Sequence, residues 1–261
     1  MAKPRIGIYG LTGCAGDELV LLNCEDELLE IVAAVDLKSF VTAQSHPEEC
    51  ELDVAFVGGA VAQPHDREVL LDVRRRAGLL IAIGTCAVWG GVAGAKNDQD
   101  RAALKRLVYR EAGYPESLPP QPLSAYVQVD FSLPGCPIEK KQLLYSLAAL
   151  LHGDLPQRIG YPVCTECRIA ENVCLLKERG LLCCGPLTQG GCGARCPSHN
   201  RPCAGCRGPV EEANVAAEYR ILLEKGYGPE EIVRRLGTFA RVPHLVELME
   251  KEGKKHAQDI A

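Results

Sequence analysis

The feature that most constrains this chain is the crowding of its cysteines. Of 14 cysteines in 261 residues, five fall within residues 1–150, nine lie from Cys164 to Cys206, and none follows. Residues 156–208 are also dense in glycine and proline, so this segment cannot bury enough apolar area to order itself. Metal–sulfur bonds can supply the missing free energy. The distribution predicts two domains with different roles, residues 1–152 and residues 153–261.

The start of the chain and its charge narrow the class of protein. Met1 leads almost directly into an apolar strand, and the sequence shows no apolar leader, no twin-arginine signal and no transmembrane run. In a reducing cytoplasm, many thiols indicate metal or redox chemistry rather than disulfides. The net charge of −5 argues against nucleic-acid binding. We therefore expect a cytoplasmic metal-binding protein with no membrane span.

Short apolar runs alternate with helix-forming segments through the first domain. Strands are expected at 5–10, 31–36, 53–59 and 79–87 and within 125–137. Helices are expected at 17–30, 63–78, 98–113 and 137–153, and again at 210–226, 228–239 and 242–253. This alternation predicts βαβ units on an open, doubly wound parallel sheet of four or five strands, an α/β fold. The second domain is expected to be irregular, with helices at its C-terminal end.

Three cysteines of the first domain follow expected strands. Cys14 follows the first strand, Cys86 the run at 79–87, and Cys136 the last strand. The carboxyl ends of the strands in an open α/β sheet share one edge, where ligands bind. We therefore expect these three thiols to converge.

The other cysteines form two sets of four. Their spacings are Cys164-x2-Cys167-x6-Cys174-x8-Cys183 and Cys192-x3-Cys196-x6-Cys203-x2-Cys206. Four thiolates are the complement of one [4Fe–4S] cluster. Two zinc ions, each held by four cysteines, are the alternative, because paired Cys-x2-Cys units also bind zinc. The three further cysteines at the sheet edge favour iron.

Seven motifs in one order carry a resemblance to a known family. They are "TGCAGDE", "GTCAVWGG", "LPGCPIEKK", "CTEC", "CLLKERGLLCCGP", "GGCGARC" and "CAGC". Together they resemble the small, electron-transferring subunit of nickel–iron hydrogenases. The chain is most similar to the cytosolic type, the delta subunit of sulfhydrogenases and its deazaflavin- or heterodisulfide-reductase-linked relatives. The resemblance covers residues 4–210 and implies a flavodoxin-like domain followed by a cluster-binding domain.

The resemblance implies three [4Fe–4S] clusters and assigns their ligands. The proximal cluster would be held by Cys14, Asp17, Cys86 and Cys136. The medial cluster would be held by Cys192, Cys196, Cys203 and Cys206, and the distal cluster by Cys164, Cys167, Cys174 and Cys183. Periplasmic relatives have a histidine where Cys164 stands and a proline where Cys196 stands. The second difference would convert a three-iron medial cluster into a four-iron one.

Two ligand positions have competitors next to them in the sequence. Asp17 stands where the family has the fourth proximal ligand, and the adjacent Glu18 is the competing carboxylate. Asp17 could also be an acidic residue favoured by the dipole of the first helical turn. Cys184 could replace Cys183 as a distal ligand. Cys24 is interpreted as a core residue.

The resemblance implies an electron-transfer subunit of a cytosolic nickel–iron hydrogenase. Dihydrogen would react on a large subunit that carries nickel and iron. Electrons would pass between that site and a flavin- or iron–sulfur-containing subunit, and then to NAD(P) or another soluble acceptor. Two alternatives stay open: the single-cluster subunit of a quinone-reducing dehydrogenase of the complex I type, and a non-redox protein with structural zinc.

Overall fold

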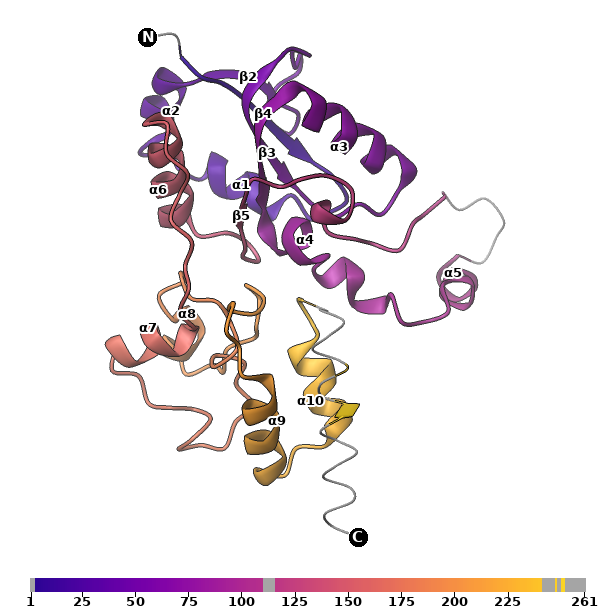
Figure 1. Cartoon of the computed structure of the whole chain (residues 1–261), viewed down its shortest axis with the longest axis vertical. Helices are drawn as coiled ribbons and strands as arrows, with labels where there is room; N and C mark the ends of the chain where they lie inside the picture. The colour runs from indigo at the N-terminus through magenta and orange to yellow at the C-terminus, as the bar shows by residue number, and fades with distance from the viewer. Residues whose placement is uncertain (1–2, 110–115, 241–246, 248–249, 252–261) are drawn as a thin grey trace. The chain divides into compact units, whose positions relative to one another are not determined.

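A computed structural model of the chain describes residues 3–109, 116–240, 247 and 250–251. The chain divides into two compact units, Met1–Pro156 and Gln157–Ala261. In Figure 1 the first unit runs from indigo to magenta, and the second from orange to yellow. Each unit has a core of its own.

The first unit is built on a five-stranded sheet in which every neighbouring pair is parallel. The strands are β1 (Arg5–Gly10), β2 (Asp36–Phe40), β3 (Leu52–Gly58), β4 (Ala77–Ile83) and β5 (Phe131–Leu133). Their order, β2-β1-β3-β4-β5, is the flavodoxin-like doubly wound order, with its switch point between β1 and β3. The fold class predicted from the sequence is confirmed.

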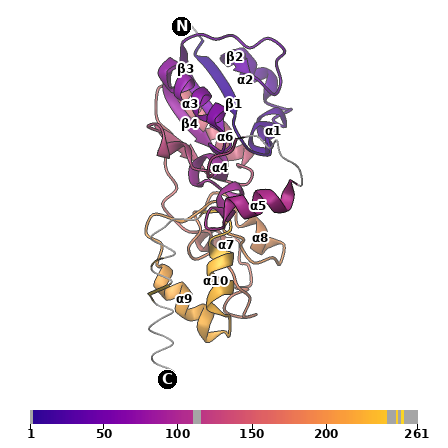
Figure 2. The same ribbon diagram turned by 90° about the vertical axis from the view of Figure 1, so that its right-hand side faces the viewer.

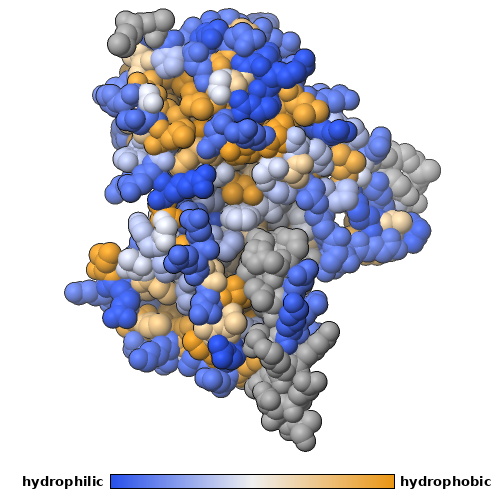
Figure 3. All heavy atoms as spheres, viewed as in Figure 1, coloured by the Kyte–Doolittle hydropathy of each residue, from blue (hydrophilic) through white to orange (hydrophobic). Residues whose placement is uncertain are grey.

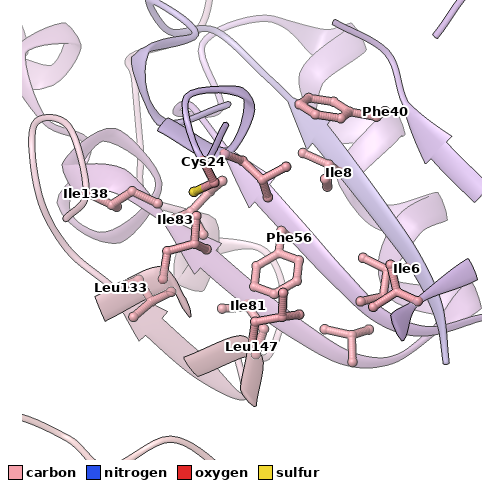
Figure 4. Close-up of a cluster of buried hydrophobic side chains, with 14 of the residues drawn as sticks. Ile6, Ile8, Cys24, Phe40, Phe56, Ile81, Ile83, Leu133, Ile138 and Leu147 are labelled. Atoms are coloured by element: carbon pink, nitrogen blue, oxygen red, sulfur yellow. The ribbon is translucent and has the colours of Figure 1, made fainter. Parts of the chain in front are cut away.

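Helices cover both faces of this sheet (Figure 2). The bounds of the main ones are α1 (Gly16–Leu22), α2 (Leu28–Ala34), α3 (Pro64–Arg76) and α6 (Lys140–Leu151). Side chains alternate along each strand, so β3 sends Val54 and Phe56 to the core under α1 and α6, and Ala55 and Val57 to the core under α3. Cys24 is fully buried in the first of these cores, as expected, and Figure 4 shows it there among the strand residues.

The predicted strand at 31–36 is wrong. These residues lie mostly in α2, and the apolar side chains of Leu28, Ile31 and Val32, with that of the C-cap Val35, line one apolar cavity with residues of the sheet. Their i, i+3, i+4, i+7 spacing is that of a helix face. The edge strand β2 begins only at Asp36, where the pairing with β1 starts.

Two expected helices also differ in extent. The segment 17–30 is divided at Asn23, the C-cap of α1, and residues from Leu28 onward belong to α2. The helix expected at 137–153 begins at Lys140 instead, with Glu139 as its N-cap. Pro137 lies in the turn before the helix.

The run at 79–87 is strand only as far as Ile83. Gly84 has a φ of +82°, which ends the extended backbone, and α4 (Gly84–Trp89) follows at once. The next elements are η1 (Val92–Lys96), α5 (Arg101–Val108) and η2 (Leu123–Ala125). The last residues of the helix expected at 98–113, and most of the helix expected at 242–253, lie outside the described residues.

The second unit has short helices and long irregular segments. Its helices are α7 (Val163–Ile169), α8 (Arg195–Ser198), α9 (Val215–Glu224) and α10 (Pro229–Leu236). Tyr219 and Leu222 of α9 pack in one core with Cys183, Cys184 and Cys203. Thiols therefore form part of the apolar interior of this unit.

Apolar side chains also remain on the surface of the first unit. Leu29 and Val32 of α2 and Tyr145 of α6 are exposed, and orange patches mark the apolar surface in Figure 3. In the described part of the chain, no helix combines the length and the apolar character needed to cross a membrane.

Candidate metal centres

The first candidate centre lies at the carboxyl edge of the sheet. Cys14 is in the loop between β1 and α1, Cys86 is in the first turn of α4 directly after β4, and Cys136 is in the loop after β5. Cys14 and Cys136 are exposed, and Cys86 is half-buried. Parallel strands end at the same edge, so the fold brings the three loops to one side of the sheet, as the sequence predicts.

The loops that carry Cys14, Cys86 and Cys136 lie close to one another. Burial, followed by the charges of Asp17 and Cys14, raises the pKa of the Cys86 thiol. A Cβ on Gly16 would lie 3.2 Å from Cys14 Sγ and 3.7 Å from the Cβ of Pro137, the neighbour of Cys136. Glycine at position 16 therefore lets the Cys14 loop approach the Cys136 loop.

Asp17 lies between the loops that carry the other two cysteines. Its Oδ1 accepts a hydrogen bond of 2.9 Å from the backbone N–H of Ile138, two residues after Cys136. The rest of its carboxylate lies against Gly84, two residues before Cys86, where a Cβ would collide with it. Burial is the main cause that raises the pKa of Asp17 to about 6, against the lowering effect of the Ile138 hydrogen bond. Asp17 is thus placed to bind a metal or to clamp the two loops.

The Glu18 side chain lies at the ends of β1 and β3, away from the cysteine loops. Its side chain is 3% exposed, and its Oε1 would lie 2.8 Å from a Cβ on Gly10 and 2.7 Å from a Cβ on Gly58. The carboxylate therefore occupies the space that side chains would take at the ends of β1 and β3, and burial raises its pKa. Of the two neighbouring acids, Asp17 is the one in contact with the loops of Cys86 and Cys136.

The second candidate centre is formed around α7. This helix carries Cys164 and Cys167, and the structure brings them near Cys174 and Cys183. Burial, and then the charges of Cys183, Cys167 and Cys174, raise the pKa of the Cys164 thiol to about 12. The Sγ atoms of Cys164 and Cys183 lie 3.3 Å and 3.5 Å from the point that a Cβ of Gly185 would occupy. All four thiols predicted for the distal cluster are therefore electrostatic neighbours.

Backbone N–H groups point at the sulfurs of this group. Cys203 N donates to Cys183 Sγ at 3.2 Å, and Lys177 N donates to Cys174 Sγ at 3.4 Å. Such donors stabilise negative charge on sulfur and tune the potential of an iron–sulfur cluster.

Cys183 and Cys184 are separated by the structure. Cys184 is 2% exposed, and its Sγ would lie 3.6 Å from a Cβ on Gly205. Burial raises the pKa of its thiol to about 12, and the nearby Arg235 opposes that rise. Cys183, by contrast, lies beside Cys164 at Gly185. The geometry favours Cys183 as the member of the α7 group.

The third set expected from the sequence is Cys192, Cys196, Cys203 and Cys206, and the thiols that act on Cys203 in the structure are those of Cys184 and Cys183. Cys196 is on α8, and Cys192 lies in the loop before that helix, where burial raises the pKa of its thiol and the Arg195 backbone opposes that rise. The Nε of Arg207, the residue after Cys206, donates to Gly190 O at 2.7 Å and so joins this loop to the Cys206 segment. The cysteine Cys203 is 5% exposed, and burial raises the pKa of its thiol.

The arrangement of these cysteines bears on the choice between zinc and an iron–sulfur cluster. Across the described residues, no three His, Cys, Asp or Glu side chains converge closely enough to hold a single metal ion. Zinc held by four cysteines needs each sulfur at about 2.3 Å from one ion. A [4Fe–4S] cluster binds each thiolate to a different iron, so its sulfurs surround a larger volume. The backbone N–H groups that donate to Cys174 Sγ and Cys183 Sγ suit the second arrangement, in which each thiolate binds its own iron.

Three charged residues of the second unit were missed by sequence reasoning. Glu166 stands inside the Cys164-x2-Cys167 unit, Arg207 follows Cys206, and Glu218 falls on the apolar stripe of α9. Burial raises the pKa of Glu218 to about 7, and its Oε1 has no hydrogen-bond partner among the described residues. The sequence does contain a signal for such residues, namely a charged residue inside a ligand motif or on the apolar face of a helix.

The chain is similar to several known proteins. Residues 14–150 match the family described as NADH ubiquinone oxidoreductase, 20 Kd subunit. The delta subunit of sulfhydrogenase 2 from Pyrococcus furiosus is 41% identical, over 91% of this chain and 99% of its own length. A subunit of the F420-non-reducing hydrogenase of Methanocaldococcus jannaschii is 30% identical, over 95% of this chain and 93% of its own length.

A solved structure also resembles the chain. A chain of an NAD+-reducing [NiFe]-hydrogenase in the H2-reduced state matches with a TM-score of 0.56 and 28% identity. The match covers 60% of this chain and 95% of that chain.

The contact of Asp17 with Gly84 gives a prediction that does not depend on metal. Replacing Gly84 by alanine should displace the carboxylate and break its bond with Ile138 N, in addition to the cost of a left-handed alanine. Gly153 is a matched control, because its φ is +81° and a Cβ there would meet nothing within 4 Å. Each substitution should cost about 1–2 kcal/mol for the backbone, and Gly84→Ala should lose about 1.5–3 kcal/mol more for the charged hydrogen bond.

Chemical denaturation of the two variants beside the unmodified protein measures this difference. Equal losses of unfolding free energy in the two variants would contradict the position of the Asp17 carboxylate described above.

Proposed function

The chain belongs to the family of nickel–iron hydrogenase small subunits and, through residues 14–150, to the NADH ubiquinone oxidoreductase 20 kDa subunit family, and on that basis we propose that it is the electron-transfer subunit of a hydrogenase. It relays electrons through three [4Fe–4S] clusters, between a nickel–iron site on a large subunit and a second redox subunit.

The placement of Cys14, Cys86 and Cys136 at one edge of the sheet, and of Cys164 beside Cys183, supports this proposal. The proximal cluster is assigned to Cys14, Asp17, Cys86 and Cys136. The medial cluster is assigned to Cys192, Cys196, Cys203 and Cys206, and the distal cluster to Cys164, Cys167, Cys174 and Cys183. Each set lies within one compact unit, and backbone N–H groups donate to the sulfurs of Cys174 and Cys183.

The residues of the chain have defined roles in such a relay. An iron–sulfur cluster, when bound, accepts and releases one electron at a time. The thiolates hold the irons, and burial of Cys183 and Cys203 keeps water from the sulfurs. Donation from Cys203 N and Lys177 N offsets the negative charge that an added electron brings.

The relatives support the proposed partners. Sulfhydrogenase 2 and the NAD+-reducing [NiFe]-hydrogenase are the proteins to which the chain is similar. We assign dihydrogen chemistry to a nickel–iron large subunit, and the onward step to a flavin- or iron–sulfur-containing subunit that reduces NAD(P) or another soluble acceptor in the cytoplasm. The exposed apolar residues of α2 and α6, Leu29, Val32 and Tyr145, are consistent with a subunit that has partners.

One observation favours a second candidate. The 20 kDa subunit family matches only residues 14–150, the part that holds a single proposed cluster. A single-cluster subunit of a quinone-reducing dehydrogenase would need no more than this part. The eight assigned ligands between Cys164 and Cys206 argue against it, because they have no role there.

Metal analysis of the complex purified without air tests the proposal. About twelve irons per chain, three clusters of four, is the expected result. About four irons would favour the single-cluster candidate, and zinc in place of iron would favour a structural metal site.

The neighbouring thiols Cys183 and Cys184 give a matched pair of variants. Cys183→Ser should lose the distal cluster, or about four irons per chain, because this sulfur lies beside Cys164 at Gly185. Cys184→Ser should keep the full iron content, because its thiol lies toward Gly205 and Arg235. The reverse pattern would assign Cys184 as the ligand.

Asp17→Cys tests the proximal ligand. A carboxylate oxygen is a harder donor than a thiolate, so the exchange should keep the iron content and move the midpoint potential of the proximal cluster. Glu18→Gln is the control, because Glu18 lies between Gly10 and Gly58 and is not assigned as a ligand. EPR-monitored redox titration measures both variants, and an unchanged spectrum and midpoint for Asp17→Cys would make the ligand assignment untenable.

A further inference from the structure

One carboxylate of the second unit touches the ligand segments of two different proposed clusters. Glu166 belongs to α7, between Cys164 and Cys167. Its Oε1 accepts a hydrogen bond of 2.7 Å from Gly191 N, and its Oε2 accepts one of 3.2 Å from Ala194 N. The same Oε2 lies 3.9 Å from Cys192 Sγ. The Glu166 side chain, which belongs to the helix with two proposed distal ligands, therefore binds the loop that carries the proposed medial ligand Cys192.

The loop turns through left-handed residues, and one of them, Ala194, is strained because it is not a glycine. Gly191 and Gly193 have φ values of +106° and +63°, and Ala194, which is not a glycine, has a φ of +50°. A left-handed alanine costs about 1–2 kcal/mol. Ala194 is also fully buried, so an unsatisfied N–H there would cost more. The two oxygens of Glu166 satisfy two N–H groups of this loop together.

The positively charged side chain of Arg207 also binds this loop. Arg207 is 1% exposed, and its Nε donates to Gly190 O at 2.7 Å. The hydroxyl of Tyr161 donates to Oε1 of Glu166 at 3.5 Å, and Tyr161 O accepts Gly190 N at 2.8 Å. The Cys192 loop is thus fixed between a negative and a positive side chain, each next to a proposed ligand.

We propose that Glu166 is a positioning residue that joins the two clusters of the second unit. It holds the medial ligand loop in place from the distal ligand helix, and its charge makes the medial cluster harder to reduce. This inference rests on the cluster assignments of the proposed function.

The two effects have separate physical causes. The hydrogen bonds from Gly191 N and Ala194 N to Glu166 fix the backbone that carries Cys192, which would hold an iron of the medial cluster. The charge acts through space, because a negative group close to a cluster opposes the addition of an electron. A partly buried position makes this effect larger than it would be in water.

Two substitutions of Glu166 separate these causes. Glu166→Gln keeps an oxygen that can accept from Gly191 N but removes the charge. Glu166→Ala removes both. Glu212→Ala is the control, because Glu212 is an exposed acid of the same unit. Cys196→Ala identifies the EPR signal of the medial cluster, because Cys196 is a proposed ligand of that cluster alone.

The intact hydrogenase complex, purified without air, is the material for the test. Iron content, EPR spectra and redox titration are the measurements. Glu166→Gln should retain the iron content and shift the midpoint of the signal altered by Cys196→Ala to a more positive value. Glu166→Ala should lose up to about four irons per chain, with loss of that same signal and retention of the others.

The proposal and the proposed function fail in different ways. Glu166→Gln and Glu166→Ala variants that match Glu212→Ala in iron content and in every midpoint would overturn the role of Glu166. A shift confined to another cluster would overturn it as well. If the Glu166→Ala variant does not accumulate, the midpoint potential of the medial cluster in Glu166→Gln alone tests the role of Glu166. Unmodified complex with far fewer than about twelve irons per chain would overturn the proposed function itself and this inference with it.

Discussion

Parallel pairing of the strands is the constraint on which the first candidate centre depends. β1, β4 and β5 run in the same direction, so the segments that follow them all begin at one edge of the sheet. Cys14, Cys86 and Cys136 are far apart in sequence and share a site only for this reason. In an antiparallel sheet, alternate segments would leave from opposite edges, and the three loops could not meet.

Close approach of backbone to sulfur and carboxylate is the second requirement. Gly16 lets the Cys14 loop reach the Cys136 loop, and Gly84 leaves room for the Asp17 carboxylate. In the second unit, Gly185 lets the backbone approach Cys164 Sγ and Cys183 Sγ closely. A methyl group at any of these positions would enter the space beside a proposed ligand, so the glycines belong to the sites as much as the cysteines do.

Carboxylates organise the ligand loops in both units. Asp17 accepts from Ile138 N at the sheet edge, and Glu166 accepts from Gly191 N and Ala194 N beside Cys192. In each case a short, glycine-bearing loop has inward N–H groups that need an acceptor, and an acid from another segment supplies it. Glu18 is the contrast, because its carboxylate fills space between two strand ends.

The sequence by itself determined the features that arise from local pattern. Alternating apolar runs and helical segments predicted the parallel sheet, and cysteine spacing predicted the two sets of four. Only the tertiary structure decided that 31–36 lies mostly in a helix, that Asp17 rather than Glu18 faces the Cys86 and Cys136 loops, and that Glu166 supports the Cys192 loop. The physical reason is that adjacent side chains leave the backbone in different directions, and what each one meets depends on segments far away in the sequence. Spacing specifies which residues can act together, and packing across the fold specifies which of them do.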